Sequence, residues 1–113
     1  MIVGIGCDIV DINRIRADEQ RLADRILTER EQAEYNRKGK AKTTYLAGRF
    51  AAKEALIKAG QTGRIRDYEI LNDADGAPHI TLPGYRVWIS IAHEKETAIA
   101  MVVLERERDH ENQ

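Results

Sequence analysis

Three short stretches of the sequence carry side chains that could act on a charged substrate. Asp8 lies near the end of an apolar stretch, and Glu54 and Lys58 lie four residues apart in an alanine-rich stretch. Residues four apart on a helix share one face, so Glu54 and Lys58 would point the same way. Carboxylates are the oxygen ligands that hold a hard cation such as magnesium, and a lysine ammonium pairs with phosphate. These residue types are therefore those of a site for a divalent cation and a phosphate.

Each of these signals also has an explanation that involves no ligand. Unpaired burial of a carboxylate costs several kcal/mol, so Asp8 needs a partner and could cap a helix or pair with an arginine. A glutamate four residues before a lysine stabilises an exposed helix by about 0.3 kcal/mol, which would account for Glu54 and Lys58. His93 ends the apolar stretch 88–92, and a lone histidine is more often a hydrogen-bonded structural residue than a catalyst. The residues alone leave both interpretations open.

Zinc and thiol chemistry have less support. His79 and His110 do not lie at zinc-site spacing from His93, and a single cysteine, Cys7, does not complete such a site. Cys7 alternates with isoleucines onto one face of a predicted strand. We expect that face to be core, where a thiol is unreactive.

Cationic side chains form two further groups. Arg14, Arg21 and Arg25 fall on one stripe if the helix that carries them is continuous. A solvated helix face is the default interpretation of this stripe. A docking surface for an acidic partner is the alternative, and charges of that kind mainly set the association rate. Arg49 and Lys53 are four residues apart, where two cations repel each other unless they are solvated or bound to an anion.

The first half of the chain is predicted to hold one strand and three helical segments. Period-two alternation over residues 2–10 predicts a strand, with Asp8 on the same face as two glycines that leave space beside its carboxylate. Helical patterns cover residues 12–27, with a break near Asp18, and residues 43–59. Between them, a capping box formed by Thr28 and Glu31 starts a helix that runs to about residue 37.

The second half changes to a period of two, which predicts strands. Residues 68–71 and 79–82 form one expected pair, joined through an Asp-Gly turn. Residues 87–92 and 98–104 form another, and a charged tail at 105–113 is expected to fray.

Length and composition restrict the class of protein. The 113 residues form one domain with a modest core, and 18 basic against 19 acidic residues leave a net charge of -1. Nucleic-acid binders usually carry a marked basic excess, so we expect no nucleic-acid partner. The apolar stretches are too short to span a membrane, and one cysteine allows no internal disulfide. We expect a cytoplasmic protein with no membrane association.

Three motifs in a fixed order carry a resemblance to a known family. Residues 5–10 read Ile-Gly-Cys-Asp-Ile-Val, residues 49–55 read Arg-Phe-Ala-Ala-Lys-Glu-Ala, and residues 90–94 read Ser-Ile-Ala-His-Glu. Together they resemble holo-acyl-carrier-protein synthase, the small group of the 4'-phosphopantetheinyl transferase superfamily. The likeness covers nearly the whole chain, and the middle motif is the most specific. It implies an α+β fold, in which a single 4'-phosphopantetheinyl transferase-like domain over residues 1–113 packs an antiparallel sheet with helices.

The resemblance also implies a function. Such enzymes are magnesium-dependent transferases that move 4'-phosphopantetheine from coenzyme A to a serine of apo-acyl carrier protein, in support of fatty acid biosynthesis. Adenosine 3',5'-bisphosphate is released. The resemblance further implies a homotrimer with an active site in each cleft between subunits.

Residue roles follow by matching the motifs. Asp8 and Glu54 would bind Mg2+, Lys58 would contact the phosphate and stabilise the leaving group, and Glu54 would be the base, directly or through a metal-bound water. Residues expected to contact coenzyme A are Arg49, Lys53, Lys58, Gly60, Gly63 and His93. Residues expected to face the carrier protein are Arg14, Arg21 and Arg25.

Two positions depart from the family pattern. Gln61 interrupts the Gly-Thr-Gly order that commonly follows the Lys-Ala pair, and Ala92 stands where a serine or threonine often precedes the histidine. Both departures concern contacts to coenzyme A and neither touches the expected metal ligands. The alternatives to a transferase are another magnesium-dependent enzyme that processes nucleotides or diphosphates, and a non-enzymatic trimeric binding domain.

Overall fold

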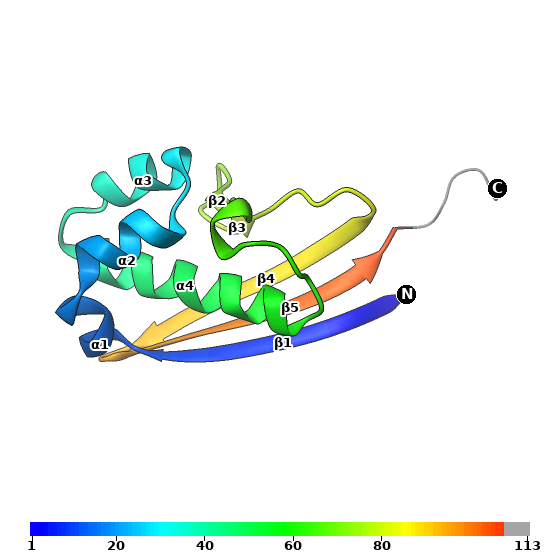
Figure 1. Ribbon diagram of the computed structural model, residues 1–113, viewed down its shortest axis with the longest axis horizontal. Helices are drawn as coiled ribbons and strands as arrows, with labels where there is room; N and C mark the ends of the chain where they lie inside the picture. The colour runs from blue at the N-terminus through cyan, green and yellow to red at the C-terminus, as the bar shows by residue number, and fades with distance from the viewer. Residues whose placement is uncertain (108–113) are drawn as a thin grey trace.

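The largest element of the fold is a three-stranded antiparallel sheet, seen in a computed structural model that describes residues 1–107. Strand β5 (Thr97–Arg106) lies between β1 (Ile2–Asp11) and β4 (Tyr85–Glu94), as Figure 1 shows. The predicted strand pair is confirmed, but its turn is tighter than expected. Both strands extend to the turn, where Lys95 takes a positive φ of 53°.

Helix α4 (Lys42–Lys58) packs on one face of this sheet, close to β1. A Cβ atom built on Gly4 would lie 1.8 Å from the carbonyl oxygen of Ala59, and one built on Gly6 would lie 1.8 Å from that of Ala55. The two glycines therefore let the helix backbone approach the strand, since any side chain would collide with it. Asp8 is the next residue on the same face of the strand, so the sheet brings it beside α4.

The opposite face of β1 is open, which corrects the prediction for Cys7. Cys7 is exposed, as are Ile5 (60%) and Ile9 (69%), although their alternation had indicated core. Alternation separates two faces of a strand but does not say which face a helix covers. Here the glycine-bearing face is covered, because it alone admits the helix backbone.

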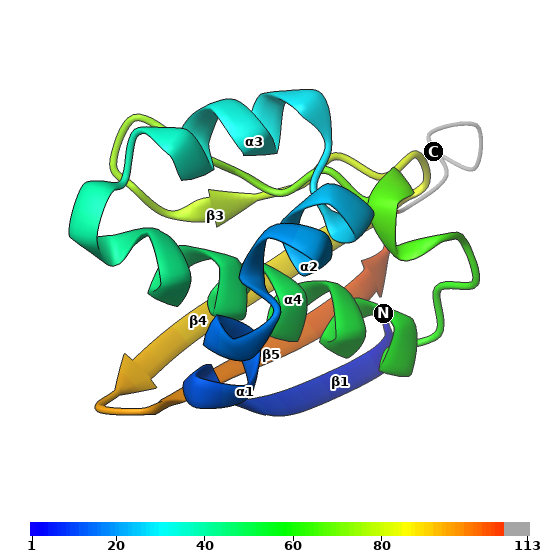
Figure 2. The ribbon, with the colours of Figure 1, turned by 60° about the vertical axis from the view of Figure 1, so that its left-hand side comes forward.

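Three short helices contact α4; as Figure 2 shows, two of them cover its side away from the sheet, and the first lies beside the end of β1. The helical pattern at 12–27 resolves into α1 (Ile12–Ala17) and α2 (Glu19–Ile26), and the predicted break at Asp18 is confirmed. Helix α3 (Glu29–Asn36) begins with the predicted capping box. Helix α4 matches the predicted helix to within one residue at each end.

The remaining elements are short. A 3-10 turn, η1 (Gly39–Ala41), precedes α4, and a second, η2 (Ile65–Asp67), follows the loop after it. A short strand pair is present as β2 (Leu71–Asn72) and β3 (Pro78–His79). Each strand has two residues rather than four and shares only one residue, Leu71 or His79, with its predicted range.

The chain end also differs from expectation. Glu105 and Arg106 belong to β5, and Glu105 pairs with Ile2, so the strand extends into the predicted tail. The rest of that tail from residue 108, with His110, lies outside the described residues. Among residues 1–107, no helix combines the length and the apolar character that crossing a bilayer requires.

Candidate functional site

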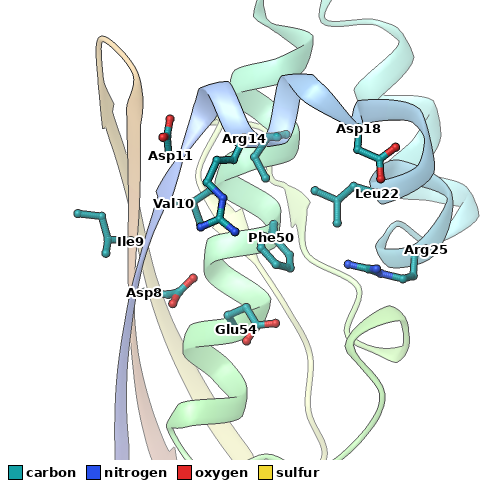
Figure 3. A pocket seen from close by; sticks show the side chains of 11 residues that line it. Asp8, Ile9, Val10, Asp11, Arg14, Asp18, Leu22, Arg25, Phe50 and Glu54 are labelled. Atoms are coloured by element: carbon teal, nitrogen blue, oxygen red, sulfur yellow. The ribbon is translucent and has the colours of Figure 1, made fainter.

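A cavity of about 540 Å³ opens where β1, α1, α2 and α4 meet. Ligand sites typically occupy roughly 300–1,000 Å³, so this cavity is large enough for a small molecule. Figure 3 shows the side chains around it. The lining residues are Asp8, Ile9, Val10, Asp11, Arg14, Ile15, Asp18, Leu22, Arg25, Phe50 and Glu54.

Asp8 and Glu54 reach this cavity from different elements. Asp8 stands on β1, where its backbone is paired with Ala100 of β5, and Glu54 stands on α4. Both carboxyl groups point into the same space in Figure 3. The two acids that lie 46 positions apart in the sequence are thus brought together, and their role as metal ligands remains a prediction.

Lys58 is held on Asp8. Its Nζ atom donates to Oδ1 of Asp8 at 2.8 Å and to the carbonyl oxygen of Cys7 at 3.3 Å. The hydrogen bond and charge of Asp8, with a smaller effect of Glu54, raise the pKa of Lys58 above its ordinary value of 10.5. Within residues 1–107, the ion pair of Lys58 is with Asp8 and not with Glu54. This geometry argues against a mere i, i+4 pair on the helix surface.

The donor set fits magnesium. Among the residues that the structure describes, no three His, Cys, Asp or Glu side chains come together as a metal site. Magnesium is usually bound by one or two carboxylates, with water and substrate phosphates as the other ligands. Two convergent carboxylates that open onto a cavity, with a lysine beside them, match that pattern better than a closed protein cage.

The predicted arginine stripe is divided. Arg14 on α1 and Arg25 on α2 both line the cavity. Arg21 does not line it: its side chain is 80% exposed, and its Nε atom lies 3.8 Å from Asp18. The backbone break at Asp18 ends the continuous helix on which one stripe depended.

Arg49 and Lys53 are placed in the interior of the chain, and their contact with coenzyme A remains a prediction. Arg49 is 4% exposed and donates to the carbonyl oxygen of Ile70 and to Asn72. Lys53 is fully buried and donates to Glu31 at 2.6 Å. The anion that relieves the repulsion between these two cations is therefore supplied inside the chain, by Glu31 for Lys53 and by Glu34 for Arg49.

The environment of these buried charges shifts two pKa values. Burial lowers the pKa of Lys53 below its ordinary value of 10.5, against the attraction of Glu31. For Glu34, burial opposes ionisation, but hydrogen bonds from Tyr45 and the Asn72 backbone, with the nearby Arg49, hold its pKa below 4.5. Each buried cation is thus paired with a carboxylate, Lys53 with Glu31 and Arg49 with Glu34. An unpaired charge in such low-dielectric surroundings would be strongly destabilising.

His93, Gly60 and Gly63 do not reach this cavity within one chain. His93 is exposed near the end of β4, beside a second hollow that includes the β4–β5 turn. Gly60 ends α4 with a φ of 122°, and the Gly63 N–H donates to the Tyr68 hydroxyl. Contacts of these residues to a coenzyme remain predictions.

Three of the cavity residues that sequence reasoning missed are Phe50, Asp11 and Asp18. Phe50 lies four residues before Glu54, so the helical period could have placed it on the same face. Asp11 caps α1 through its carboxylate, which accepts from the Asn13 N–H at 2.9 Å. Asp18 lies at the break between α1 and α2, and no sequence signal pointed it toward the cavity.

Comparisons with known proteins show the family of this chain. The family model of the 4'-phosphopantetheinyl transferase superfamily matches residues 4–107. The holo-[acyl-carrier-protein] synthase of Listeria innocua is 43% identical over 118 residues, with 94% of this chain and all of that protein covered. The protein of the same name from Oceanobacillus iheyensis is 45% identical over 93% of this chain and 98% of its own length.

Solved structures show the same fold. A holo-(acyl-carrier-protein) synthase from Bacillus anthracis, solved in complex with CoA (3',5'-ADP), superposes with a TM-score of 0.87 at 46% identity, covering 95% of this chain and 99% of that one. The Neisseria meningitidis enzyme superposes with a TM-score of 0.82 at 40% identity, covering 94% of this chain and 100% of that one. This likeness over nearly the full length shows that the chain belongs to the 4'-phosphopantetheinyl transferase superfamily, in its holo-acyl-carrier-protein synthase group.

Proposed function

We propose that this chain transfers the 4'-phosphopantetheine group of coenzyme A to a serine of apo-acyl carrier protein, giving holo-acyl carrier protein and adenosine 3',5'-bisphosphate. The observation that carries the proposal is that Asp8 and Glu54 line one cavity while Lys58 forms an ion pair with Asp8. In a chain of this family, two carboxylates and an ammonium are the groups that a diphosphate substrate requires. The cytoplasm is the compartment that we infer for this reaction.

Asp8 and Glu54 are the residues that would hold Mg2+. When bound, the ion would withdraw charge from the diphosphate of coenzyme A and fix its orientation. Lys58 then has a second function beside that of pairing with Asp8. The Lys58 side chain is 54% exposed, so its ammonium can turn to the diphosphate oxygen of the leaving group. There it would stabilise the negative charge that develops as the bond breaks.

The transfer makes one bond and breaks one. The serine oxygen of the carrier attacks the phosphorus atom that bears the pantetheine arm, and the bond from that phosphorus to the bridging oxygen breaks. Glu54 accepts the serine proton, and the electron pair of the broken bond leaves with adenosine 3',5'-bisphosphate. A carboxylate that faces the cavity from the middle of a packed helix keeps a fixed position for this step.

Arg14 and Arg25 provide the positive side of the cavity, from α1 and α2. An acidic carrier surface would be drawn to these arginines, and long-range attraction of this type speeds encounter. Arg21, exposed and near Asp18, would act as a peripheral charge.

A homotrimer completes the proposal. The sheet face opposite α4 exposes Ile5, Ile9, Trp88, Ile99 and Met101, each at least 41% accessible. Contiguous apolar surface of this kind typically marks a protein interface. His93 lies outside the cavity of its own chain, so we infer that a neighbouring subunit's His93 supplies the coenzyme contact.

The test is mass spectrometry of a purified apo-acyl carrier protein after incubation with this protein, coenzyme A and Mg2+. The carrier should gain the mass of one phosphopantetheine group, and Asp8→Ala and Glu54→Ala should abolish the gain. A parallel reaction without carrier separates this function from a hydrolase, which would consume coenzyme A by itself. If several apo carriers gain no mass with the wild-type protein, the proposal is wrong.

A further inference from the structure

The two walls of the cavity belong to different layers of the fold. Asp8, Phe50 and Glu54 come from β1 and α4, and Leu22 and Arg25 come from α2. The width of the cavity therefore depends on how α2 is fixed to α4. Figure 3 shows Arg25 and Glu54 on facing sides of the opening.

One buried side chain makes this connection. The Nζ atom of Lys53 donates to the carbonyl oxygen of Ile26, the last residue of α2, at 2.5 Å, and to Oε1 of Glu31 at 2.6 Å. Lys53 and Glu31 are both fully buried, so their charges have little access to water. Charge-assisted hydrogen bonds in such surroundings are short and strongly directional.

The sequence positions of the two bonded groups are informative. Ile26 follows Arg25 directly, and Lys53 precedes Glu54 directly. The hydrogen bond from Lys53 to Ile26 thus connects two helices. It joins α2 at the residue next to Arg25 to α4 at the residue next to Glu54. Glu31 belongs to α3 and so links the same ammonium to that helix. Its other oxygen, Oε2, accepts from the N–H of Ile70, which directly precedes β2, at 2.8 Å.

We propose that Lys53 is a positioning residue, which sets the separation between Arg25 and Glu54 and so places the serine of a docked carrier at the reacting phosphorus. This inference rests on the proposed function. It assigns Lys53 no contact with substrate, and it replaces the coenzyme contact that the family resemblance implied for this residue.

The experiment compares steady-state transfer kinetics of the wild type and Lys53→Met, corrected for the folded fraction measured by circular dichroism. Methionine keeps a similar length and apolar bulk but removes the ammonium. Misplacement of about 1 Å can cost roughly 100-fold in rate, so we expect kcat/KM for the carrier to fall by about 10- to 100-fold. The Kd for coenzyme A should stay within about twofold of the wild-type value, since that contact is not expected to depend on α2.

Glu34→Gln is the matched control. It weakens the other buried ion pair, between Glu34 and Arg49, which connects α4 to Asn72 and not to α2. This variant should lose stability and keep the wild-type carrier kinetics per folded molecule. Lys53→Met could instead lower stability and leave kcat and KM for the carrier unchanged, as expected for the control. In that case Lys53 has no positioning role.

Gln32→Met covers the case in which Lys53→Met does not fold. The Gln32 Nε2 atom donates to the carbonyl oxygen of Ala23 at 3.0 Å, so it holds the same last turn of α2 from a partly buried position. We expect a smaller fall in kcat/KM for the carrier, with coenzyme A binding again unchanged. A Gln32→Met enzyme with wild-type carrier kinetics would count against the inference. Absence of transfer by the wild-type protein would instead refute the proposed function.

Discussion

The Nζ atom of Lys58 lies 2.8 Å from the Oδ1 atom of Asp8, so the carboxylate that we assign to the metal already has a cation beside it. A divalent ion must share or replace this contact. Lysine and metal are therefore competitors for Asp8 when coenzyme A is absent. When coenzyme A is present, its diphosphate offers the ammonium another anion.

This competition predicts that Lys58→Met binds Mn2+ or Mg2+ more tightly than the wild type in the absence of coenzyme A. Exposed ion pairs are weak, so the gain in affinity should be small, up to about fivefold. Isothermal titration with the metal alone measures it. Lys40→Met removes an exposed lysine on η1 and should leave the affinity unchanged. Weaker metal binding by Lys58→Met would contradict the competition.

Glu54→Gln should abolish most of the transfer while the protein stays folded. The amide keeps the shape of the side chain but can neither accept the serine proton nor bind a cation as a carboxylate does. Loss of general-base catalysis alone lowers rates by about 100-fold or more. Carrier modification followed by mass spectrometry measures the rate, and circular dichroism checks the fold. Near-wild-type turnover in Glu54→Gln would remove this residue from the mechanism.

Charge reversal at Arg25 should affect the carrier more than charge reversal at Arg21. Arg25 lines the cavity, whereas Arg21 is 80% exposed and lies beside Asp18. We expect Arg25→Glu to raise KM for the carrier and to weaken its salt dependence, with little change in coenzyme A binding. Arg21→Glu should show a smaller change of the same kind. Steady-state kinetics at low and high ionic strength distinguish the two variants. Equal changes in KM for the carrier would show that Arg21 and Arg25 act together, as the predicted stripe required.

Gly6→Ala should destabilise the fold strongly. A Cβ atom at this position would lie 1.8 Å from the carbonyl oxygen of Ala55, so β1 and α4 would have to separate. Overpacking of this type costs about 3 kcal/mol or more of unfolding free energy. Urea unfolding measures it. Gly48→Ala is the comparison, because its Cβ would meet the movable side chain of Ile91 at 2.9 Å, and the loss there should be much smaller.

Glu34 should contribute stability at neutral pH that disappears in acid. Its pKa in the folded chain lies below 4.5, so folding favours the ionised form. Its contribution is therefore fully present above about pH 5 and is lost as the pH falls through the folded-state pKa. The difference in unfolding free energy between the wild type and Glu34→Gln should be larger at neutral pH than at about pH 4. A difference that does not vary with pH would show that ionisation of Glu34 has no role.

The sequence predicted the elements better than it predicted their surroundings. The capping box at Thr28, the break at Asp18 and helix α4 depend on local signals, and all three are confirmed. The strands of the small hairpin were predicted too long, because tertiary contacts set where pairing ends. Local periodicity carries no information about such contacts.

The sequence also did not predict which charged side chains are buried. Lys53 sits next to Glu54 and follows Arg49 by four residues, a pattern typical of an exposed basic face. Its partner Glu31 belongs to a helix 22 positions away, and Glu31 had been interpreted for its part in the capping box. That Asp8 and Glu54 lie at one cavity was expected from the family resemblance. Sequence spacing alone does not show that a strand and a distant helix meet.

Strand β1 also tolerates no shift in register. Gly4 and Gly6 lie against α4 and Asp8 and Val10 line the cavity, whereas the alternating residues Ile5, Cys7 and Ile9 are exposed on the outer face. Deleting or inserting one residue between Gly6 and Asp8 would turn Asp8 outward and push a bulky side chain against α4. Such a change would take Asp8 out of the cavity and would disrupt the apolar outer face that we propose as the subunit contact, so this strand should accept neither insertions nor deletions.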